Sequence, residues 1–247
     1  HLSFAYPAGR KILEDISFTA EPGQIIGITG AVACGKSTLG KVFLGECPYD
    51  GKIIYRGKDL QAFKDAERSE NIGYLGHDPE LFNDSLKNNV RMGDAVSAEP
   101  YFRAVCIDEE IAEMPDGKET LVGTGGVRLS GGQAQRLALA RTLYHKRPVM
   151  ILDDPFSALD KNTEKEIFAH LRQMTADSIV LLISHRLYLF PEMDQVIWME
   201  DERTTVGTHE ELLEDKPEYA ELFRAQTDAV QTDPVPEGGL DREESFR

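Results

Sequence analysis

The sequence predicts an α/β fold with a mostly parallel central sheet covered by helices. Continuous apolar runs of strand length occur at 24–29, 149–152 and 178–183, which is typical of strands buried on both faces. Segments with helical spacing separate these runs, as the crossovers between parallel strands require. A chain of 247 residues is long enough for one such domain with a subdomain.

The first residues predict an antiparallel β edge. Residues 2–6 alternate between apolar and polar side chains, and residues 12–20 resume an extended pattern that ends in the turn at 21–23. Short strands are expected at 51–57 and 72–75. The chain starts at His1 inside a strand pattern, so we also expect it to be a fragment of a longer protein.

Helical patterns fill the middle and the end of the chain. Residues 84–115 have helical spacing with interruptions at Gly93 and Pro100, which predicts an inserted helical subdomain at about 77–137. Capping-box spacings at Ser130 and Thr208 each predict a helix start. These two helices are expected at 130–145 and 208–225. Two more helices are expected at 37–44 and 163–174.

The composition limits the classes of partner. A net charge of -16 argues against nucleic acid as a partner, because nucleic-acid binding depends on Lys and Arg. Most of this excess lies from Glu200 onward, where 15 acidic residues face 5 basic ones. We therefore expect a domain at 1–227 and an acidic, disordered tail at 228–247.

Two further features concern the compartment. No run of about 18 apolar residues occurs, so no membrane-spanning helix is expected. The three cysteines, Cys34, Cys47 and Cys106, form no C-x-x-C pair, which suits a reducing compartment and predicts no metal site.

A phosphate-binding loop follows the first apolar run. Residues 30–38 read G-x-x-x-x-G-K-[ST], and its glycines let successive backbone N–H groups point at one anion at a helix N-terminus. The Lys36 ammonium can reach the β- and γ-phosphates, and the Ser37 hydroxyl can complete the shell of a Mg²⁺ ion. The predicted nucleotide-binding residues are Gly30, Ala31, Val32, Ala33, Cys34, Gly35, Lys36, Ser37 and Thr38.

Two carboxylates end the strand predicted at 149–152. Asp153 can hold Mg²⁺ through water, and Asp154 can face the γ-phosphate and its attacking water. Ser130 to Gln133 form a second glycine-containing helix start, whose N–H groups have no phosphate to bind within this chain.

In combination, these motifs resemble the nucleotide-binding domain of an ATP-binding cassette transporter of the exporter type, over residues 1–227. The most specific one is Leu129-Ser130-Gly131-Gly132-Gln133, which stands between the phosphate loop and the acidic strand. Residues 157–160 resemble the D-loop of the family and residues 207–212 its closing segment. His185 resembles its switch histidine, and Tyr6 its adenine-stacking aromatic residue.

The resemblance implies a P-loop NTPase core that hydrolyses ATP with Mg²⁺ and works as a dimer. Each ATP would lie between the phosphate loop of one chain and the signature of a second nucleotide-binding domain. The signature residues here are Ser130, Gly131, Gly132 and Gln133. Transmembrane domains would be the other partners, which places the domain at the cytoplasmic face of the cell membrane.

Three positions depart from the family pattern. Asp154 stands where a catalytic Glu is usual, and a misplacement of about 1 Å at the reacting centre can cost on the order of 100-fold in rate. His77 replaces the usual Gln, although imidazole is a less natural Mg²⁺ ligand than an amide oxygen. Thr124 stands where such exporters usually carry Glu, in a segment thought to face the membrane domain.

These departures fall on the hydrolysis side, whereas the signature is intact. This asymmetry resembles heterodimeric exporters with one degenerate site, so we expect slow turnover at this chain's own site and a different partner chain. The predicted catalytic residues are Asp154, His185 and His77, and the predicted metal-binding residues are Ser37, Asp153 and His77.

Two alternatives stay open at this point. One is a soluble cassette ATPase of nucleic-acid repair or translation, although the segment between His77 and Leu129 is too short for a long coiled coil. The other is a regulatory module that binds ATP without turnover, which the shorter side chain of Asp154 keeps open.

Overall fold

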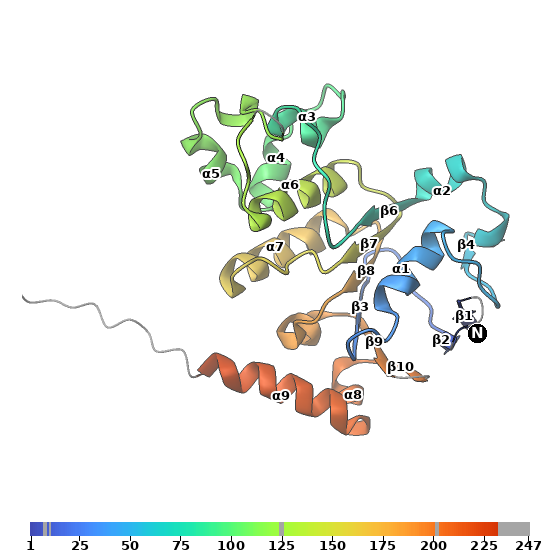
Figure 1. Cartoon of the computed structure of the whole chain (residues 1–247). Helices are drawn as coiled ribbons and strands as arrows, with labels where there is room; N and C mark the ends of the chain where they lie inside the picture. The colour runs from blue at the N-terminus through green and yellow to red at the C-terminus, as the bar shows by residue number, and fades with distance from the viewer. Residues whose placement is uncertain (7–8, 10, 124–125, 201–202, 232–247) are drawn as a thin grey trace, which may run out of the picture.

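A six-stranded sheet with the order β10-β9-β3-β8-β7-β6 forms the centre of the computed structural model (Figure 1). The structure describes residues 1–6, 9, 11–123, 126–200 and 203–231. The parallel strands are β3 (Ile25–Gly30), β6 (Ile72–Leu75), β7 (Val149–Asp153), β8 (Ile179–Ile183) and β9 (Gln195–Glu200). The predicted α/β class with a mostly parallel sheet is therefore confirmed.

The sheet separates two hydrophobic cores. Alternate residues of β7 point to opposite faces, so that Met150 and Leu152 join one core while Val149 and Ile151 join the other. The first core includes residues of α6 (Gly131–Tyr144), of α7 (Lys161–Met174) and of the helices that precede α6. The second includes residues of β1 (Leu2–Ala5), β2 (Lys11–Ile16) and α1 (Lys36–Leu44). All residues of β3 and β7 are buried, which explains their continuous apolar sequences.

The antiparallel pairs differ in detail from the expectation. Strands β1 (Leu2–Ala5) and β2 (Lys11–Ile16) do pair antiparallel, but they form a separate sheet of two strands. The antiparallel edge of the large sheet is β10 (Arg203–Gly207), which pairs with β9. The single strand expected at 51–57 is instead a hairpin of β4 (Ile54–Tyr55) and β5 (Lys58–Asp59).

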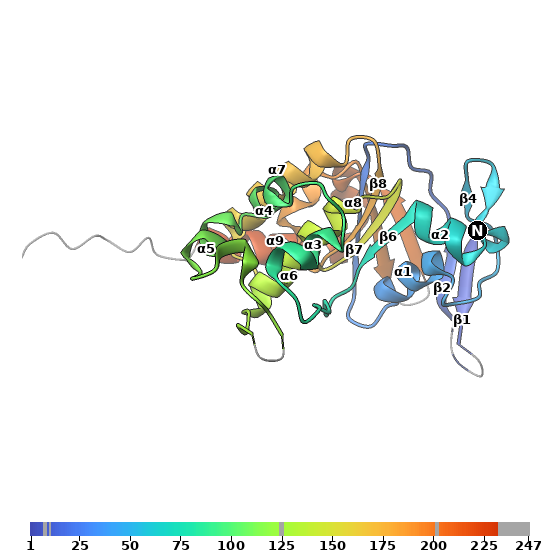
Figure 2. The same ribbon diagram turned by 90° about the horizontal axis from the view of Figure 1, so that it is seen from above.

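Helices of the middle segment lie together on one side of the molecule (Figures 1 and 2). They are α3 (Leu86–Arg91), α4 (Glu99–Ala104), α5 (Asp108–Glu113) and α6 (Gly131–Tyr144). We call them the helical lobe; the predicted bounds of a subdomain at 77–137 stay a prediction. Helix α2 (Asp65–Asn71) was not predicted, because none of its residues is buried and it therefore lacks apolar periodicity.

The C-terminal helix expected at 208–225 is two helices, α8 (His209–Asp215) and α9 (Pro217–Gln231). Pro217 has no N–H and disfavours helical backbone at the preceding residue, and Lys216 is accordingly extended. Helix α9 continues beyond 228, where the tail was expected to begin. Residues 232–247 of that expected tail lie outside the described residues.

The remaining elements complete the fold. They are α1 (Lys36–Leu44), α7 (Lys161–Met174) and the short 3-10 helices η1 (Leu60–Ala62), η2 (Gly117–Glu119) and η3 (Leu187–Glu192). Across the described ranges, no helix combines the length and the apolar character that a membrane span requires.

Candidate functional site

Four loops with predicted site residues leave the carboxyl edge of the central sheet. The phosphate loop follows β3, and the loop with His185 follows β8. Asp153 ends β7, and His77 follows β6. Because these four strands are parallel and adjacent in the sheet, their ends meet at one edge, which is where open α/β sheets bind ligands.

Glycine is required at both glycine positions of the phosphate-loop motif, Gly30 and Gly35. A Cβ on Gly30 would lie 1.9 Å from the carbonyl oxygen of Met199, and one on Gly35 would lie 2.6 Å from Ile12 Cγ2. Gly35 has φ 100° and is the N-cap of α1, with no side chain capping the helix. The first turn of α1 therefore keeps its N–H groups for an anion.

Lys36 is a buried cation with no anionic partner among the described residues. Its side chain donates hydrogen bonds to the carbonyl oxygens of Gly30 (3.1 Å) and Ala31 (2.6 Å) and contacts Cys34 Sγ at 3.6 Å. Burying an ammonium group without a counter-charge is unfavourable. The loop is thus arranged for an anion that the chain itself does not supply.

A cavity of about 290 Å³ lies against the phosphate loop. Its lining joins residues 32–38 to Tyr6, Ile12 and His185, so two predicted residues from distant segments reach the loop. Tyr6 is 47% exposed, and its ring packs edge-on against Phe4, which leaves a face for a stacking ligand.

Asp153 is a buried anion with no cationic partner among the described residues. It is 4% exposed, and its Oδ2 accepts a hydrogen bond of 3.4 Å from the Tyr74 hydroxyl. Burial, followed by the Asp153 charge, raises the pKa of Tyr74 to about 12, so the phenol remains a neutral donor. A buried carboxylate without a cation fits the Mg²⁺ that the sequence predicts.

Asp154 adopts a left-handed backbone with φ 51°, and its N–H donates to the Ile183 carbonyl at 2.9 Å. Asp tolerates this conformation better than most residues with side chains. His77 Nδ1 lies 3.8 Å from Asp154 Oδ2. Burial raises the pKa of Asp154, while attraction to His185 and then to His77 opposes that rise. The structure thus brings the three predicted catalytic residues together.

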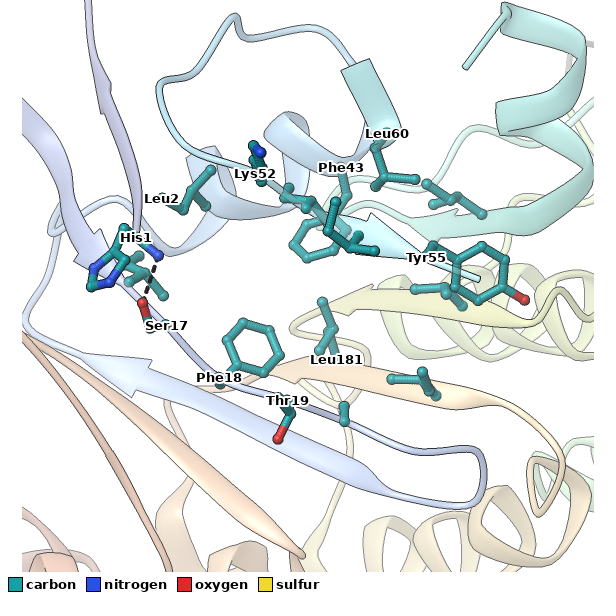
Figure 3. A pocket seen from close by; sticks show the side chains of 17 residues that line it. His1, Leu2, Ser17, Phe18, Thr19, Phe43, Lys52, Tyr55, Leu60 and Leu181 are labelled. Atoms are coloured by element: carbon teal, nitrogen blue, oxygen red, sulfur yellow. Dashed lines mark hydrogen bonds between the residues drawn. The ribbon is translucent and has the colours of Figure 1, made fainter. Parts of the chain in front are cut away.

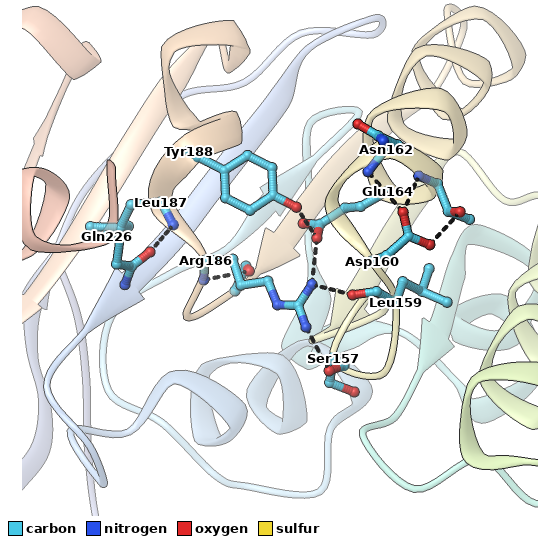
Figure 4. Close-up of polar contacts among 11 residues, drawn as sticks. Ser157, Leu159, Asp160, Asn162, Glu164, Arg186, Leu187, Tyr188 and Gln226 are labelled. Atoms are coloured by element: carbon cyan, nitrogen blue, oxygen red, sulfur yellow. Dashed lines mark hydrogen bonds and ion pairs between the residues drawn. The ribbon is translucent and has the colours of Figure 1, made fainter. Parts of the chain in front are cut away.

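An arginine clamp behind the site was not predicted from the sequence (Figure 4). Arg186 Nη1 donates to Glu164 Oε2 and to the Leu159 carbonyl, at 2.8 and 2.7 Å, and Nη2 donates to the Ser157 carbonyl at 2.8 Å. Glu164 is fully buried, and burial raises its pKa. The ion pair fastens the segment after β8 to α7, and the two carbonyl bonds fasten it to residues 157–160.

Helix α9 holds the same segment from its other side (Figure 4). Gln226 Oε1 accepts from the Leu187 N–H at 2.8 Å, and its Nε2 donates to the His185 carbonyl, also at 2.8 Å. Sequence reasoning missed both anchors, because each joins residues that are far apart in the chain and match no short motif.

The signature lies at the start of α6, in the helical lobe, and none of its residues lines the cavity at the phosphate loop. Ser130 and Gln133 form a reciprocal capping box, and Gln133 Nε2 also donates to Glu110 at 2.8 Å. Within the described part of the chain, the N–H groups of Gly131 and Gly132 have no hydrogen-bond acceptor. The signature is therefore apart from the chain's own phosphate site.

The two glycines differ in their surroundings. A Cβ on Gly132 would lie 3.0 Å from the Ala158 carbonyl oxygen, so packing against the loop after β7 accounts for this glycine. Among the described residues, a Cβ on Gly131 would meet nothing within 4 Å. No contact with these residues explains why Gly131 lacks a side chain.

A second and larger cavity, of about 420 Å³, lies at the opposite edge of the sheet (Figure 3). Its lining includes Ile72, Val149 and Ile179, the first residues of β6, β7 and β8, together with the Phe18 ring. This cavity is mainly apolar and contains none of the predicted site residues.

A family model described as "ABC transporter" matches residues 13–157. The chain belongs to the ABC transporter family. It is therefore an ATP-binding domain, and the family resemblance of its motifs is confirmed. The roles of the individual site residues stay predictions, and Thr124 lies outside the described residues.

Similar proteins agree with this assignment. The chain is 37% identical over 236 residues to the "ATP-dependent lipid A-core flippase" of Burkholderia pseudomallei, covering 92% of this chain and 39% of that protein. It is 37% identical over 243 residues to the flippase of the same name from Pseudomonas aeruginosa, covering 95% and 40%. The chain thus spans about two fifths of the length of these relatives.

The fold also matches a solved structure, "Structure of a bacterial Atm1-family ABC exporter with ATP bound". The TM-score is 0.84 at 30% sequence identity, over 92% of this chain and 42% of that chain. These similarities support the exporter interpretation and give no support to the soluble repair or translation ATPase.

Proposed function

We propose that this chain is the ATP-hydrolysing domain of a membrane exporter and works at the cytoplasmic face of the membrane. The observation that supports this best is a pair of buried charges at one sheet edge, neither of which has an ion-pair partner among the described residues. Lys36 begins α1 after the loop that follows β3, and Asp153 ends β7. A magnesium nucleotide supplies the anion that Lys36 lacks and the cation that Asp153 lacks.

Each group of residues at the site has a defined role in this proposal. The N–H groups of residues 30–38 and the Lys36 ammonium bind the phosphates, and Tyr6 stacks on the base. Ser37, Asp153 and His77 hold Mg²⁺, which neutralises charge on the phosphate oxygens when it is bound.

Hydrolysis at this site is proposed to be slow. Asp154, with a pKa raised by burial, can accept a proton from the attacking water, and His185 lies on the same cavity at the phosphate loop. The Asp154 carboxylate is one methylene shorter than that of the usual Glu, so it reaches the water less well. A regulatory module that binds ATP without turnover is a second candidate, because the shorter side chain of Asp154 would also account for binding without hydrolysis.

The signature is proposed to complete the site of a second nucleotide-binding domain. Gly131 supports this role. Its missing side chain relieves no contact with the residues that the structure describes, but it would let a partner's phosphate approach the backbone. Given the departures at Asp154 and His77, that partner is proposed to be a different chain. Transmembrane domains would carry the transported substrate, and the flippase relatives favour a lipid.

Lys36→Ala tests the nucleotide site directly. Charge-assisted hydrogen bonds contribute about 1.5 to 3 kcal/mol, so the change is expected to weaken Mg-ATP binding roughly ten- to hundredfold. Equilibrium dialysis of the purified chain with ATP measures this loss. Lys41→Ala is the matched control, because Lys41 is an exposed residue of the same helix and should leave the affinity unchanged. Equal affinity for wild type and Lys36→Ala would refute the proposal.

A further inference from the structure

Three residues with metal-binding side chains meet at the contact between the helical lobe and α7. One ligand atom from each of Cys106, Glu166 and His170 lies within 4.8 Å of the other two. We propose that these residues form a divalent transition-metal site, of the kind that binds Zn²⁺, which joins the helical lobe to the sheet domain. The site is separate from the nucleotide site and does not depend on its function.

The backbone brings these residues together from two elements. Glu166 and His170 are four residues apart on α7, so they share one face of that helix. Cys106 lies in the turn between α4 and α5, and α4 contacts α7 (Figure 2). Cysteine spacing alone gave no sign of this cluster, because only one cysteine takes part.

His170 is already oriented as a ligand. Its Nδ1 is 3.0 Å from the carbonyl oxygen of Ala104. Because a carbonyl can only accept, Nδ1 carries the proton and Nε2 keeps its lone pair. A metal-binding histidine usually donates its other ring N–H to a carbonyl or carboxylate in this way, which fixes the ring.

The Cys106 thiol lies in a setting that a cation would stabilise. The thiol is hydrogen-bonded to the Glu166 carboxylate, so a negative charge lies beside it. A divalent cation would displace the thiol proton: the S–H bond breaks, a metal–sulfur bond forms, and the proton leaves to solvent. Cys106 also has φ 53°, a conformation unusual for a residue with a side chain.

Two other charged groups act on the thiol. Arg136 opposes a cation there, but its Nη2 is paired with Glu110 Oε1 at 2.5 Å, which offsets its charge. Asp108 adds a negative charge that favours a cation. Arg136 Nη1 also donates to the Cys106 carbonyl, so a metal at this turn would be linked to the signature helix α6.

The ligand set selects the metal. Thiolate and imidazole favour Zn²⁺ and its neighbours in the first transition row, whereas Mg²⁺ and Ca²⁺ prefer oxygen ligands. Three protein ligands leave one position of a tetrahedral site for water.

Cobalt(II) is the probe for the test, because a cobalt–thiolate bond gives a charge-transfer absorption that no other ligand here produces. The purified chain is freed of metal with a chelator and titrated with Co²⁺. We expect one Co²⁺ per chain with thiolate absorption, displaced by Zn²⁺. Cys106→Ser should abolish the absorption, and Cys47→Ser should retain it, because Cys47 is a buried cysteine outside the cluster.

No thiolate absorption in the wild type, or absorption that persists in Cys106→Ser, would overturn the proposal. Glu166→Gln and His170→Gln give a second test that keeps the thiol. Each should weaken Co²⁺ binding at least about tenfold, since even the loss of groups behind the ligands has an effect of this size. Glu218→Gln, an exposed change on α9, is the matched control. Unchanged affinity in both cluster variants would also refute the site.

Discussion

The carboxyl edge of the sheet and the start of α6 satisfy their polar groups in opposite ways. At the sheet edge, Lys36 and Asp153 are buried charges that make hydrogen bonds but have no oppositely charged partner among the described residues. At the start of α6, the side chains of Ser130 and Gln133 each accept from the other residue's backbone N–H, and Gln133 Nε2 donates to Glu110. Among the described residues, the N–H groups of Gly131 and Gly132 have no acceptor there.

This difference separates the two surfaces that are proposed to bind phosphate. The sheet edge buries two charges, Lys36 and Asp153, that no described residue neutralises. A ligand that brings both an anion and a cation would therefore stabilise it most. The start of α6 is complete without a ligand and offers only backbone donors at a helix N-terminus. Changes at the sheet edge should therefore affect binding within this chain, whereas changes at α6 should affect only an assembled complex.

The largest expected effect concerns the clamp behind the sheet edge. Arg186→Ala leaves the carboxylate of Glu164 fully buried and without its cation, which should lower the free energy of unfolding by about 3 kcal/mol. Urea denaturation measures this loss. Arg172→Ala is the matched control, because its ion pair with Asp194 is partly exposed and should be worth less than about 1 kcal/mol.

The same variant should show a pH dependence of defined sign. Burial raises the pKa of Glu164 in the folded state, so the carboxylate destabilises the fold once the pH exceeds its unfolded value. The stability deficit of Arg186→Ala should be largest near neutral pH and shrink as the pH falls and Glu164 becomes protonated. A deficit that is constant or grows toward low pH would contradict this account of the clamp.

A bulky side chain at Gly131 should impair the start of α6 without affecting the sheet edge. Gly131→Tyr adds its side chain into open space, so folding and Mg-ATP binding by the chain itself should be unchanged. It would fill the surface offered to a partner's phosphate, and turnover of the assembled complex should fall on the order of 100-fold. Loss of ATP binding by the isolated variant would show that the two surfaces are not independent.

Much of the sheet and of its loops could be predicted from the sequence. Strands β3, β7 and β8 were predicted because burial on both faces leaves an apolar run, and the loops after β3 and β7 carry short motifs. Helix α2 was missed because it buries no residue. Strands β9 and β10 were also missed, although β9 contains an apolar run that could have revealed it.

The contacts that support the site could not be predicted in this way. The bond between Gln226 and the His185 carbonyl depends on where α9 docks, and no local pattern encodes that. The meeting of Cys106 with α7 depends in the same way on how the helical lobe packs. Sequence motifs identify groups that face a ligand, whereas the residues that position them emerge only from tertiary packing.

The central claim is that this sheet edge binds Mg-ATP tightly but hydrolyses it slowly, because the carboxylate of Asp154 is too short. Single-turnover hydrolysis tests it most directly, comparing wild type with Asp154→Glu across protein concentration. The left-handed backbone at this position should make the Glu variant about 1 kcal/mol less stable, so both proteins are compared under saturating nucleotide.

The account predicts tight binding with negligible wild-type hydrolysis, and about tenfold faster turnover in Asp154→Glu that rises with protein concentration as dimers form. Brisk hydrolysis by the wild-type chain would contradict it, because Asp154 would then be a fully competent catalytic group.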